Sequence, residues 1–382
     1  MTNSVTVSLP MLSSSSWWRR HQFRLEPRTG LIAGLPSRIR EFRDHVLRSI
    51  RVRFKLECAE SAEDAREVAM HAIAVNEYGA NPALVELPKP QPGPREILIK
   101  VRTAGMNPGD RQIADGVWKD RVPGTFPLVL GADVAGVVES VGEGTAKFAA
   151  GDEIFGQLLI PPLGSTGTYA EYVAVTEDAP LAKLPNGFDA VVAATLPTPG
   201  GTALQMVTSV EPLSDKTALV VGAGGGVGSF ATQFAVNAGA HVIADTSGSD
   251  TDRMRSYGAD EMIDYSAVSV TDTVHRAHPD GIDALIDVAS DADEFAALSS
   301  FVRSGGSAVT TRYVADTAKL SARGVTGVNF SYQCSPEVLG RLADAVVAGR
   351  IAVPPTTTIK LDDVPLAMSG GGPHGGKTVI AL

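Results

Sequence analysis

The sequence predicts an α/β protein in which a doubly wound parallel sheet is combined with a smaller, β-rich domain. A length of 382 residues suits two domains better than one. Between residues 193 and 325, strand-like and helix-like segments alternate, as they do in parallel sheets whose strands are joined by crossover helices. Between residues 70 and 192, short alternating strands are separated by Pro and Gly, which is typical of a small barrel.

Composition excludes several classes of protein. Apolar residues make up 44% of the chain, so a large core can be buried, and no apolar run is long enough to predict a membrane span. The two cysteines, Cys58 and Cys334, cannot supply a disulfide framework or a four-cysteine zinc site, and we expect ordinary reduced thiols. The net charge of −10 predicts a poor binder of nucleic acid.

Residues 1–69 differ from the rest of the chain because they are rich in Arg and Ser and lack a strand rhythm. Three interpretations compete: an organellar transit peptide, a basic amphipathic helix over residues 37–51 that lies on a membrane surface, or a disordered extension, which could also reflect a start codon assigned too early. The third is favoured because a clean strand-like segment begins at Met70. The predicted location is therefore cytoplasmic, with organellar targeting as the alternative.

The β-rich part is expected to form one domain over residues 70–192. Its clearest strand is Glu96–Val101, where apolar and polar residues alternate as on a half-buried strand. Residues 134–138 and 169–175 show the same pattern.

The alternating part is expected to form a second domain over residues 193–325. It opens with a buried strand at residues 217–222 and a helix at residues 227–238. Further predicted strands cover 242–245, 261–263, 284–287 and 307–311, and further predicted helices cover 252–257 and 294–302. Beyond this domain, the last fifty residues are expected to return to mixed strands with one helix over residues 336–349.

A glycine-rich turn, Gly222–Gly228, joins the first strand and helix of this second domain. An early glycine permits the tight turn, Gly225 lets the backbone approach a pyrophosphate, and Gly228 lets the helix pack closely on the strands. The pyrophosphate would lie at the helix N-terminus, which favours negative charge. The turn thus predicts a Rossmann domain that binds a dinucleotide. The predicted cofactor-binding residues here are Gly222, Ala223, Gly225, Gly226, Val227 and Gly228.

NADP(H) is the predicted dinucleotide. Ser247 stands about twenty residues beyond the turn, where NAD sites carry an acid that binds the ribose 2′-hydroxyl. Arg253 follows on the next turn, and a hydroxyl with a cation suits a 2′-phosphate. Asp245 opposes this prediction if its side chain points inward, and Arg253 would also suit a solvated helix position.

Several stretches in the right order resemble the medium-chain dehydrogenase/reductase superfamily, and most closely its zinc-independent quinone oxidoreductase (zeta-crystallin-like) branch. These stretches are residues 104–110, 131–138, 141–144, 148–156, 258–265 and 376–379. The resemblance covers Met70 to Leu382. It implies a GroES-like β-barrel domain, residues 70–192 completed by residues 326–382, with the Rossmann domain inserted. It also implies a cofactor in the cleft between the two domains and a homodimer.

The same resemblance predicts that no metal is bound. Zinc-dependent members hold their catalytic zinc with Cys, His and Cys. Asn107 stands where the first Cys would be, and Ala132 stands where the His would be.

Without a metal, the hydride must move to an acceptor that needs little electrophilic help, such as a quinone or a conjugated enone. The resemblance places Asn107 facing the nicotinamide and substrate, as the candidate catalytic hydrogen-bond donor; its alternative role is to form the turn before Pro108. Trp118 stands where related enoyl-thioester reductases carry a proton-donating Tyr, so it is expected either to wall a flat substrate or simply to pack.

Two further cofactor contacts follow from the resemblance. Thr202 is similar to the nicotinamide-side Thr of the family, with a helix cap as its alternative role. Tyr265 resembles a residue near the adenosine phosphate, with packing of its ring as the alternative.

The predicted function is therefore that of a zinc-independent, NADPH-dependent oxidoreductase that passes hydride to a quinone or conjugated enone. The alternatives are another carbonyl or enoyl-thioester reductase of the same superfamily, or a noncatalytic NADPH-binding protein. The predicted partner is a small-molecule substrate, without nucleic acid and without a membrane span.

Overall fold

Six parallel strands form the predicted doubly wound sheet in a computed structural model, which describes residues 69–371 and 376–382. The strands are β9 (Thr217–Val221), β10 (His241–Thr246), β11 (Glu261–Asp264), β12 (Ile282–Asp287), β13 (Val302–Thr310) and β14 (Thr326–Asn329). Their spatial order is β11-β10-β9-β12-β13-β14, and every neighbouring pair is parallel. The chain runs outward from β9 in one direction and from β12 in the other. The topological switch point, where such sheets bind ligands, therefore lies beside the carboxyl end of β9.

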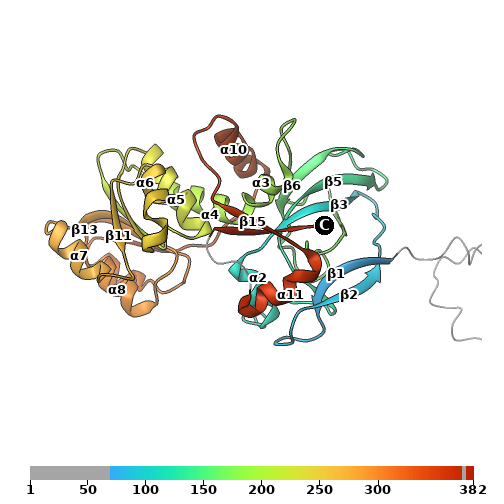
Figure 1. Ribbon diagram of the computed structural model, residues 1–382, viewed down its shortest axis with the longest axis horizontal. Helices are drawn as coiled ribbons and strands as arrows, with labels where there is room; N and C mark the ends of the chain where they lie inside the picture. Colours follow the sequence, from blue (N-terminus) through green and yellow to red (C-terminus); the bar gives the residue numbers. More distant parts are fainter. Residues whose placement is uncertain (1–68, 372–375) are drawn as a thin grey trace, which may run out of the picture. The chain divides into compact units, whose positions relative to one another are not determined.

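Helices cover both faces of this sheet (Figure 1). They are α5 (Gly226–Asn237), α6 (Thr251–Ser256), α7 (Val270–Ala277), α8 (Ala292–Ser299) and α9 (Thr317–Ala322). On β9, Ala218 and Val220 pack in the apolar cluster that contains residues of α5 and α6, whereas Leu219 and Val221 pack in the cluster of α7 and α8. Burial on both faces explains why β9 reads as a continuous apolar run.

The β-rich part contains a seven-stranded and a three-stranded sheet. The strands are β1 (Ala69–Val75), β2 (Ala83–Pro88), β3 (Glu96–Gly105), β4 (Leu128–Val129), β5 (Asp133–Val141), β6 (Glu153–Gln157), β7 (Tyr172–Thr176), β8 (Leu181–Lys183), β15 (Thr356–Lys360) and β16 (Lys377–Ala381). In the larger sheet β16, from the end of the chain, pairs antiparallel with β3. Both ends of the described chain therefore build the same GroES-like domain, as the resemblance implied.

The remaining helices join these sheets or flank them. They are α2 (Pro108–Ala114), α3 (Ala190–Ala194), α4 (Pro197–Ser209), α10 (Pro336–Val347), α11 (Val364–Leu366) and the short turns η2 (Gly248–Asp250), η3 (Leu361–Asp363) and η4 (Ala367–Gly371). Helix α4 packs against α5. Within the described part of the chain, no helix has the length and apolar character needed to cross a bilayer.

The fold class is confirmed, and the differences lie at element boundaries and in helices that were not predicted, among them α4, α7 and α9. The helix predicted over residues 294–302 ends at Ser299, because the chain turns at residues 300–301 and begins β13. Strand β14 extends the parallel sheet beyond residue 325, the boundary expected for the Rossmann domain. Helix α4 was not predicted, because Pro197, Pro199 and two glycines fill its first turns; Pro is tolerated there, where backbone N–H groups lack helical partners.

Candidate functional site

The glycine turn leads from β9 into α5 at the switch point of the sheet. Gly222 has a φ of 75°, a conformation that favours glycine, and Gly225 is the residue that caps α5. No side chain among the described residues caps this helix. Its first backbone N–H groups are therefore available to an anion, and the helix dipole favours negative charge there.

Gly225 and Gly228 face different surroundings. A Cβ atom added at Gly228 would lie 2.6 Å from the Ala223 Cα and closer still to the Gly222 carbonyl, so this position holds the helix against the turn. At Gly225 the added Cβ would meet only the Gly222 oxygen, at 3.4 Å, among the described residues. The space next to Gly225 is therefore open, whereas Gly228 is enclosed by backbone.

Beyond β10, the structure brings Ser247 and Arg253 together through a third residue, Asp250. The Arg253 guanidinium lies 2.7 Å from Asp250 Oδ1, and the Ser247 hydroxyl donates to Asp250 Oδ2 over 3.2 Å. Arg253 also donates to the Gly224 carbonyl (2.8 Å) and to Ser229 Oγ (2.6 Å). With its side chain only 14% exposed, Arg253 is not the solvated helix residue considered as its alternative role.

Asp245 points inward, which is the condition under which it opposes binding of NADP. Its residue is 4% exposed, and Oδ1 has no hydrogen-bond partner in residues 69–371 and 376–382. Burial raises the pKa of Asp245 to about 6, the Gly222 amide opposes the rise, and the charges of Glu294 and Asp287 add to it.

Tyr265 lies at the same edge of the sheet as Ser247. Its backbone N–H donates to the Thr246 carbonyl, and the residue is 56% exposed. Neither of its two predicted roles is decided by these contacts, so the adenosine contact remains a prediction.

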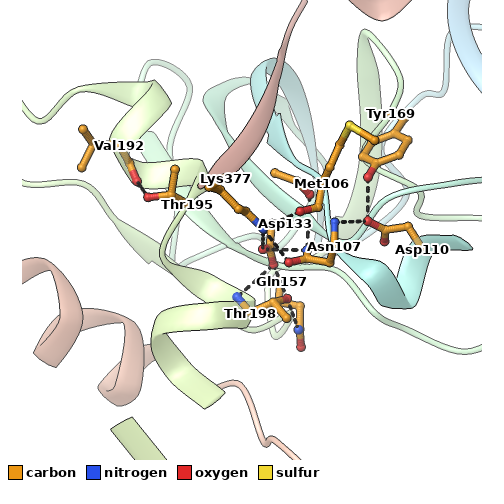
Figure 2. A network of polar contacts seen from close by, with 11 residues as sticks. Met106, Asn107, Asp110, Asp133, Gln157, Tyr169, Val192, Thr195, Thr198 and Lys377 are labelled. Carbon is orange, nitrogen blue, oxygen red and sulfur yellow. Dashed lines mark hydrogen bonds and ion pairs between the residues drawn. The ribbon is translucent and has the colours of Figure 1, made fainter. Parts of the chain in front are cut away.

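On the barrel side, Asn107 belongs to a polar network that links distant segments (Figure 2). Its Nδ2 donates to Asp133 Oδ2 (2.9 Å) and to the Gly105 carbonyl (3.3 Å), and its Oδ1 accepts from Lys377 Nζ (2.5 Å). The amide that was predicted to face the substrate is thus already bonded at both ends. In this arrangement Asn107 positions other groups, and its role as donor to the substrate remains a prediction.

Lys377 and Asp133 form a buried ion pair at the centre of this network. Nζ lies 3.7 Å from Asp133 Oδ2 and donates to the Met106 carbonyl over 2.6 Å. Burial lowers the pKa of Lys377, and the charges of Asp133 and Asp110 oppose this. Burial likewise raises the pKa of Asp133 against the attraction of Lys377.

A second carboxyl group, Asp110, supports the same segment. Its Oδ2 accepts from the Asn107 backbone N–H (2.7 Å) and from the Tyr169 hydroxyl (2.6 Å), and the residue is 2% exposed. Burial raises the pKa of Asp110 to about 6 in spite of these two hydrogen bonds, with the charge of Asp133 contributing.

The network reaches α4 through Thr198. The Thr198 hydroxyl donates to Asp133 Oδ1 (2.5 Å) and accepts from Gln157 Nε2 (2.6 Å). The next residue, Pro199, has its Cβ 3.6 Å from the position of an added Cβ at Gly226. Thr198 therefore connects the polar groups of the barrel with the glycine turn.

Two other predicted site residues do not join this network. Thr202 is buried in α4, and Thr198 rather than Thr202 makes the polar contacts there. Trp118 is half-buried against an apolar cluster of the barrel, and an added Cβ at Gly109 would lie 3.5 Å from its ring. These contacts favour packing for Trp118, and its role in walling a substrate remains a prediction.

Cys334 is half-buried beside the network. Burial raises the pKa of its thiol to about 11, the nearby Tyr332 side chain opposes the rise, and the charge of Asp133 adds to it. The thiol is therefore protonated at neutral pH, as expected for an ordinary cysteine. Over the described ranges, no group of three or more His, Cys, Asp or Glu side chains is arranged to hold a metal ion.

Sequence reasoning missed Asp133, Thr198, Gln157 and Lys377 as members of the site. A signal was present for two of them. Asp133 and Lys377 are charged residues at the start of strongly apolar strands, and a charge in such a position is rarely buried without a partner.

Two family models match the chain: an alcohol dehydrogenase GroES-like domain over residues 93–186 and a zinc-binding dehydrogenase domain over residues 226–335. A mitochondrial NAD(P)H oxidoreductase of Mus musculus is 32% identical over 367 residues, which cover 84% of this chain and 91% of the relative. A chloroplast envelope quinone oxidoreductase homolog of Arabidopsis thaliana is 38% identical over 205 residues, which cover 51% of this chain and 61% of the relative.

Among solved structures, the quinone oxidoreductase from Coxiella burnetii superimposes with a TM-score of 0.72 and 26% identity, covering 82% of this chain and 99% of that one. The chain therefore belongs to the medium-chain dehydrogenase/reductase superfamily. Within it, the chain belongs to the quinone oxidoreductase branch. Its match with the plant relative spans about three fifths of that relative's length.

Proposed function

We propose that this chain is an oxidoreductase that takes hydride from a reduced nicotinamide dinucleotide and passes it, without zinc, to a quinone or a conjugated enone. The observation that carries the proposal is the pairing of two features. An uncapped helix N-terminus behind a glycine turn suits a pyrophosphate, and α4 brings Pro199 close to that helix start and Thr198, the preceding residue, into the buried polar network of the barrel. The relatives named NAD(P)H oxidoreductase and quinone oxidoreductase support the same class of reaction.

The glycine turn would hold the dinucleotide through the backbone N–H groups at the start of α5, with Gly225 leaving room for the pyrophosphate. When bound, the dinucleotide supplies the hydride. The proposal does not depend on whether the dinucleotide is NADH or NADPH, and the preference for NADPH predicted from the sequence rests on Ser247 and Arg253. Asp250 binds both of these side chains and therefore affects that preference.

Gln157 is the member of the network that we assign to the substrate. Its amide donates one N–H to Thr198, is half-exposed, and makes no other side-chain hydrogen bond among the described residues. A second N–H thus remains to stabilise the negative charge that develops on the oxygen of a quinone or enone as hydride arrives. Asp133 accepts hydrogen bonds from Thr198 and so orients Gln157, and Lys377 pairs with Asp133. The proton that completes the reduction comes from solvent.

The test is an acceptor screen in which NADH and NADPH are each supplied with a 1,4-quinone, a conjugated enone, a saturated ketone, an enoyl thioester or no acceptor. Consumption with the quinone or the enone is expected. Turnover confined to saturated ketones or thioesters would favour the alternative reductases, and binding without turnover would favour a noncatalytic protein.

A variant separates the assignment of Gln157 from the rest of the proposal. Gln157→Leu should lower kcat about tenfold or more while the Kd for the dinucleotide stays unchanged. The control is Gln112→Leu, because Gln112 is a half-exposed glutamine on α2. An undiminished kcat in Gln157→Leu would remove Gln157 from the site.

Location and assembly remain predictions. The names of the mitochondrial and chloroplast relatives support the transit-peptide interpretation of residues 1–69, of which residues 1–68 lie outside the described part of the chain. A homodimer is expected from the resemblance alone, and sedimentation of the purified chain tests it.

A further inference from the structure

Asp250 lies at the end of η2, directly against the glycine turn. An added Cβ at Gly224 would be 2.6 Å from Asp250 Oδ2. Both carboxylate oxygens are engaged, Oδ1 by the Arg253 guanidinium and Oδ2 by the Ser247 hydroxyl. Because Arg253 also holds the Gly224 carbonyl, these residues and the turn form one connected cluster.

A ribose 2′-phosphate in this region would compete with Asp250 for the Arg253 guanidinium and the Ser247 hydroxyl. Such a phosphate binds best to a guanidinium and a hydroxyl, and Arg253 and Ser247 supply both. Asp250 holds both groups and adds a negative charge that repels a phosphate dianion.

Neighbouring carboxylates act in the same direction. Asp245 is buried with one oxygen unpartnered among the described residues, and Asp264 lies close to Gly248, where an added Cβ would be 2.5 Å from Asp264 Oδ2. A free ribose 2′-hydroxyl, in contrast, can donate to a carboxylate, which is how acids at this end of a Rossmann sheet select NAD. The charges around the cluster therefore suit a hydroxyl better than a phosphate.

We infer that Asp250 decides which dinucleotide this site accepts. Its carboxylate binds Arg253 and Ser247, so these two side chains are not free to bind a 2′-phosphate. The chain accordingly binds NADH at least as tightly as NADPH, against the preference predicted from the sequence, and loss of the carboxylate converts the site to one that favours NADPH. The inference rests on the proposed function, because it requires a dinucleotide at the glycine turn.

The variant that tests this inference is Asp250→Asn. Asn has the same size and can still accept the hydrogen bond from Ser247, but it loses the ion pair with Arg253 and the negative charge. Asp250→Asn should bind NADPH about tenfold more tightly than the parent, and NADH within about twofold of it, because one charge-assisted contact is gained by the phosphate alone. Adding Arg253→Ala to this variant should abolish the gain.

The matched control is Asp252→Asn. Asp252 lies two residues away, its side chain is 95% exposed, and it pairs with Arg255 on the surface of α6. It carries the same charge, but its carboxylate makes no hydrogen bond or ion pair with Arg253, Ser247 or Gly224 among the described residues, so its loss should leave the ratio of the two affinities within about twofold of the parent.

The readout is binding, measured by fluorescence titration of NADH and NADPH beside a thermal melt of each variant. Competition by 2′,5′-ADP and by 5′-AMP isolates the contribution of the phosphate, and it remains available if a variant melts early. Equal ratios in the parent and Asp250→Asn, a parent that prefers NADPH tenfold, or the same gain from Asp252→Asn would each overturn the inference alone. A folded parent that binds neither dinucleotide would overturn the proposed function as well.

Discussion

The glycine turn and the polar network of the barrel are the two halves of the candidate site, and they are built in opposite ways. The turn consists of consecutive residues, and its contacts are made by the backbone of Gly222–Gly228. The network joins side chains from segments as far apart in sequence as Asn107 and Lys377, which are 270 residues apart. The turn therefore depends on small residues that leave space, whereas the network depends on charges that compensate one another in a buried setting.

The largest expected loss of stability follows from removing the charge of Lys377. Lys377→Met would leave the carboxylate of Asp133 buried without its cationic partner, at a cost of about 3–5 kcal/mol in the free energy of unfolding. The control Lys319→Met removes an 86% exposed lysine that pairs with Asp316, and it should cost less than about 1 kcal/mol. Denaturant unfolding measures both, and equal losses would show that the network does not depend on its buried charges.

The network should also make stability depend on pH through Asp110. Burial raises the pKa of Asp110 to about 6 in the folded protein, above its ordinary value of 3.8. The folded state therefore binds the proton more tightly than the unfolded state. The stability that this group contributes is full below about pH 4 and is lost as the pH rises through about 6.

Asp110→Asn removes this titration. Between about pH 4 and pH 7 the free energy of unfolding of the variant should therefore fall less than that of the parent, by about 2 kcal/mol. Asp245, whose pKa is also raised to about 6, leaves part of the slope in place. Unfolding curves across this range measure the difference. Identical slopes in parent and variant would show that Asp110 titrates normally.

The turn is tested by the contrast between two glycines. Gly228→Val brings its side chain against backbone atoms and should cost about 1–3 kcal/mol of stability, as overpacking does. Gly225→Val points into open space and should leave the melting temperature nearly unchanged while it abolishes dinucleotide binding. Thermal melts measure the stability and fluorescence titrations measure the binding. Unaltered binding in Gly225→Val would show that the turn does not bind the dinucleotide.

The smallest expected effect concerns metal. Asn107 and Ala132 lack the thiolate and imidazole that a catalytic zinc requires, so a chelator should leave turnover unchanged and elemental analysis should find no stoichiometric zinc. One tightly bound zinc per chain would contradict this expectation.

The two halves of the site also differ in how far the sequence predicts them. The glycine turn, its strand and its helix could be predicted because the constraint is local: β9 and α5 lie within one or two residues of their expected bounds. The arrangement of Asn107 could not, because its partners Asp133 and Lys377 reach it only through the pairing of β3, β5 and β16. Asp250 was not predicted for a related reason, because its position next to Gly224 depends on how the fold places η2 beside the glycine turn.

The central claim is that both halves serve one hydride transfer, and isotope labelling tests it most directly. The chain is supplied with a conjugated enone and with dinucleotide carrying deuterium on one or the other face of the nicotinamide C4. The account predicts that one of the two labelled dinucleotides, and only one, delivers deuterium to the carbon skeleton of the reduced enone, as read by mass spectrometry. Reduced enone without deuterium from either dinucleotide would contradict it.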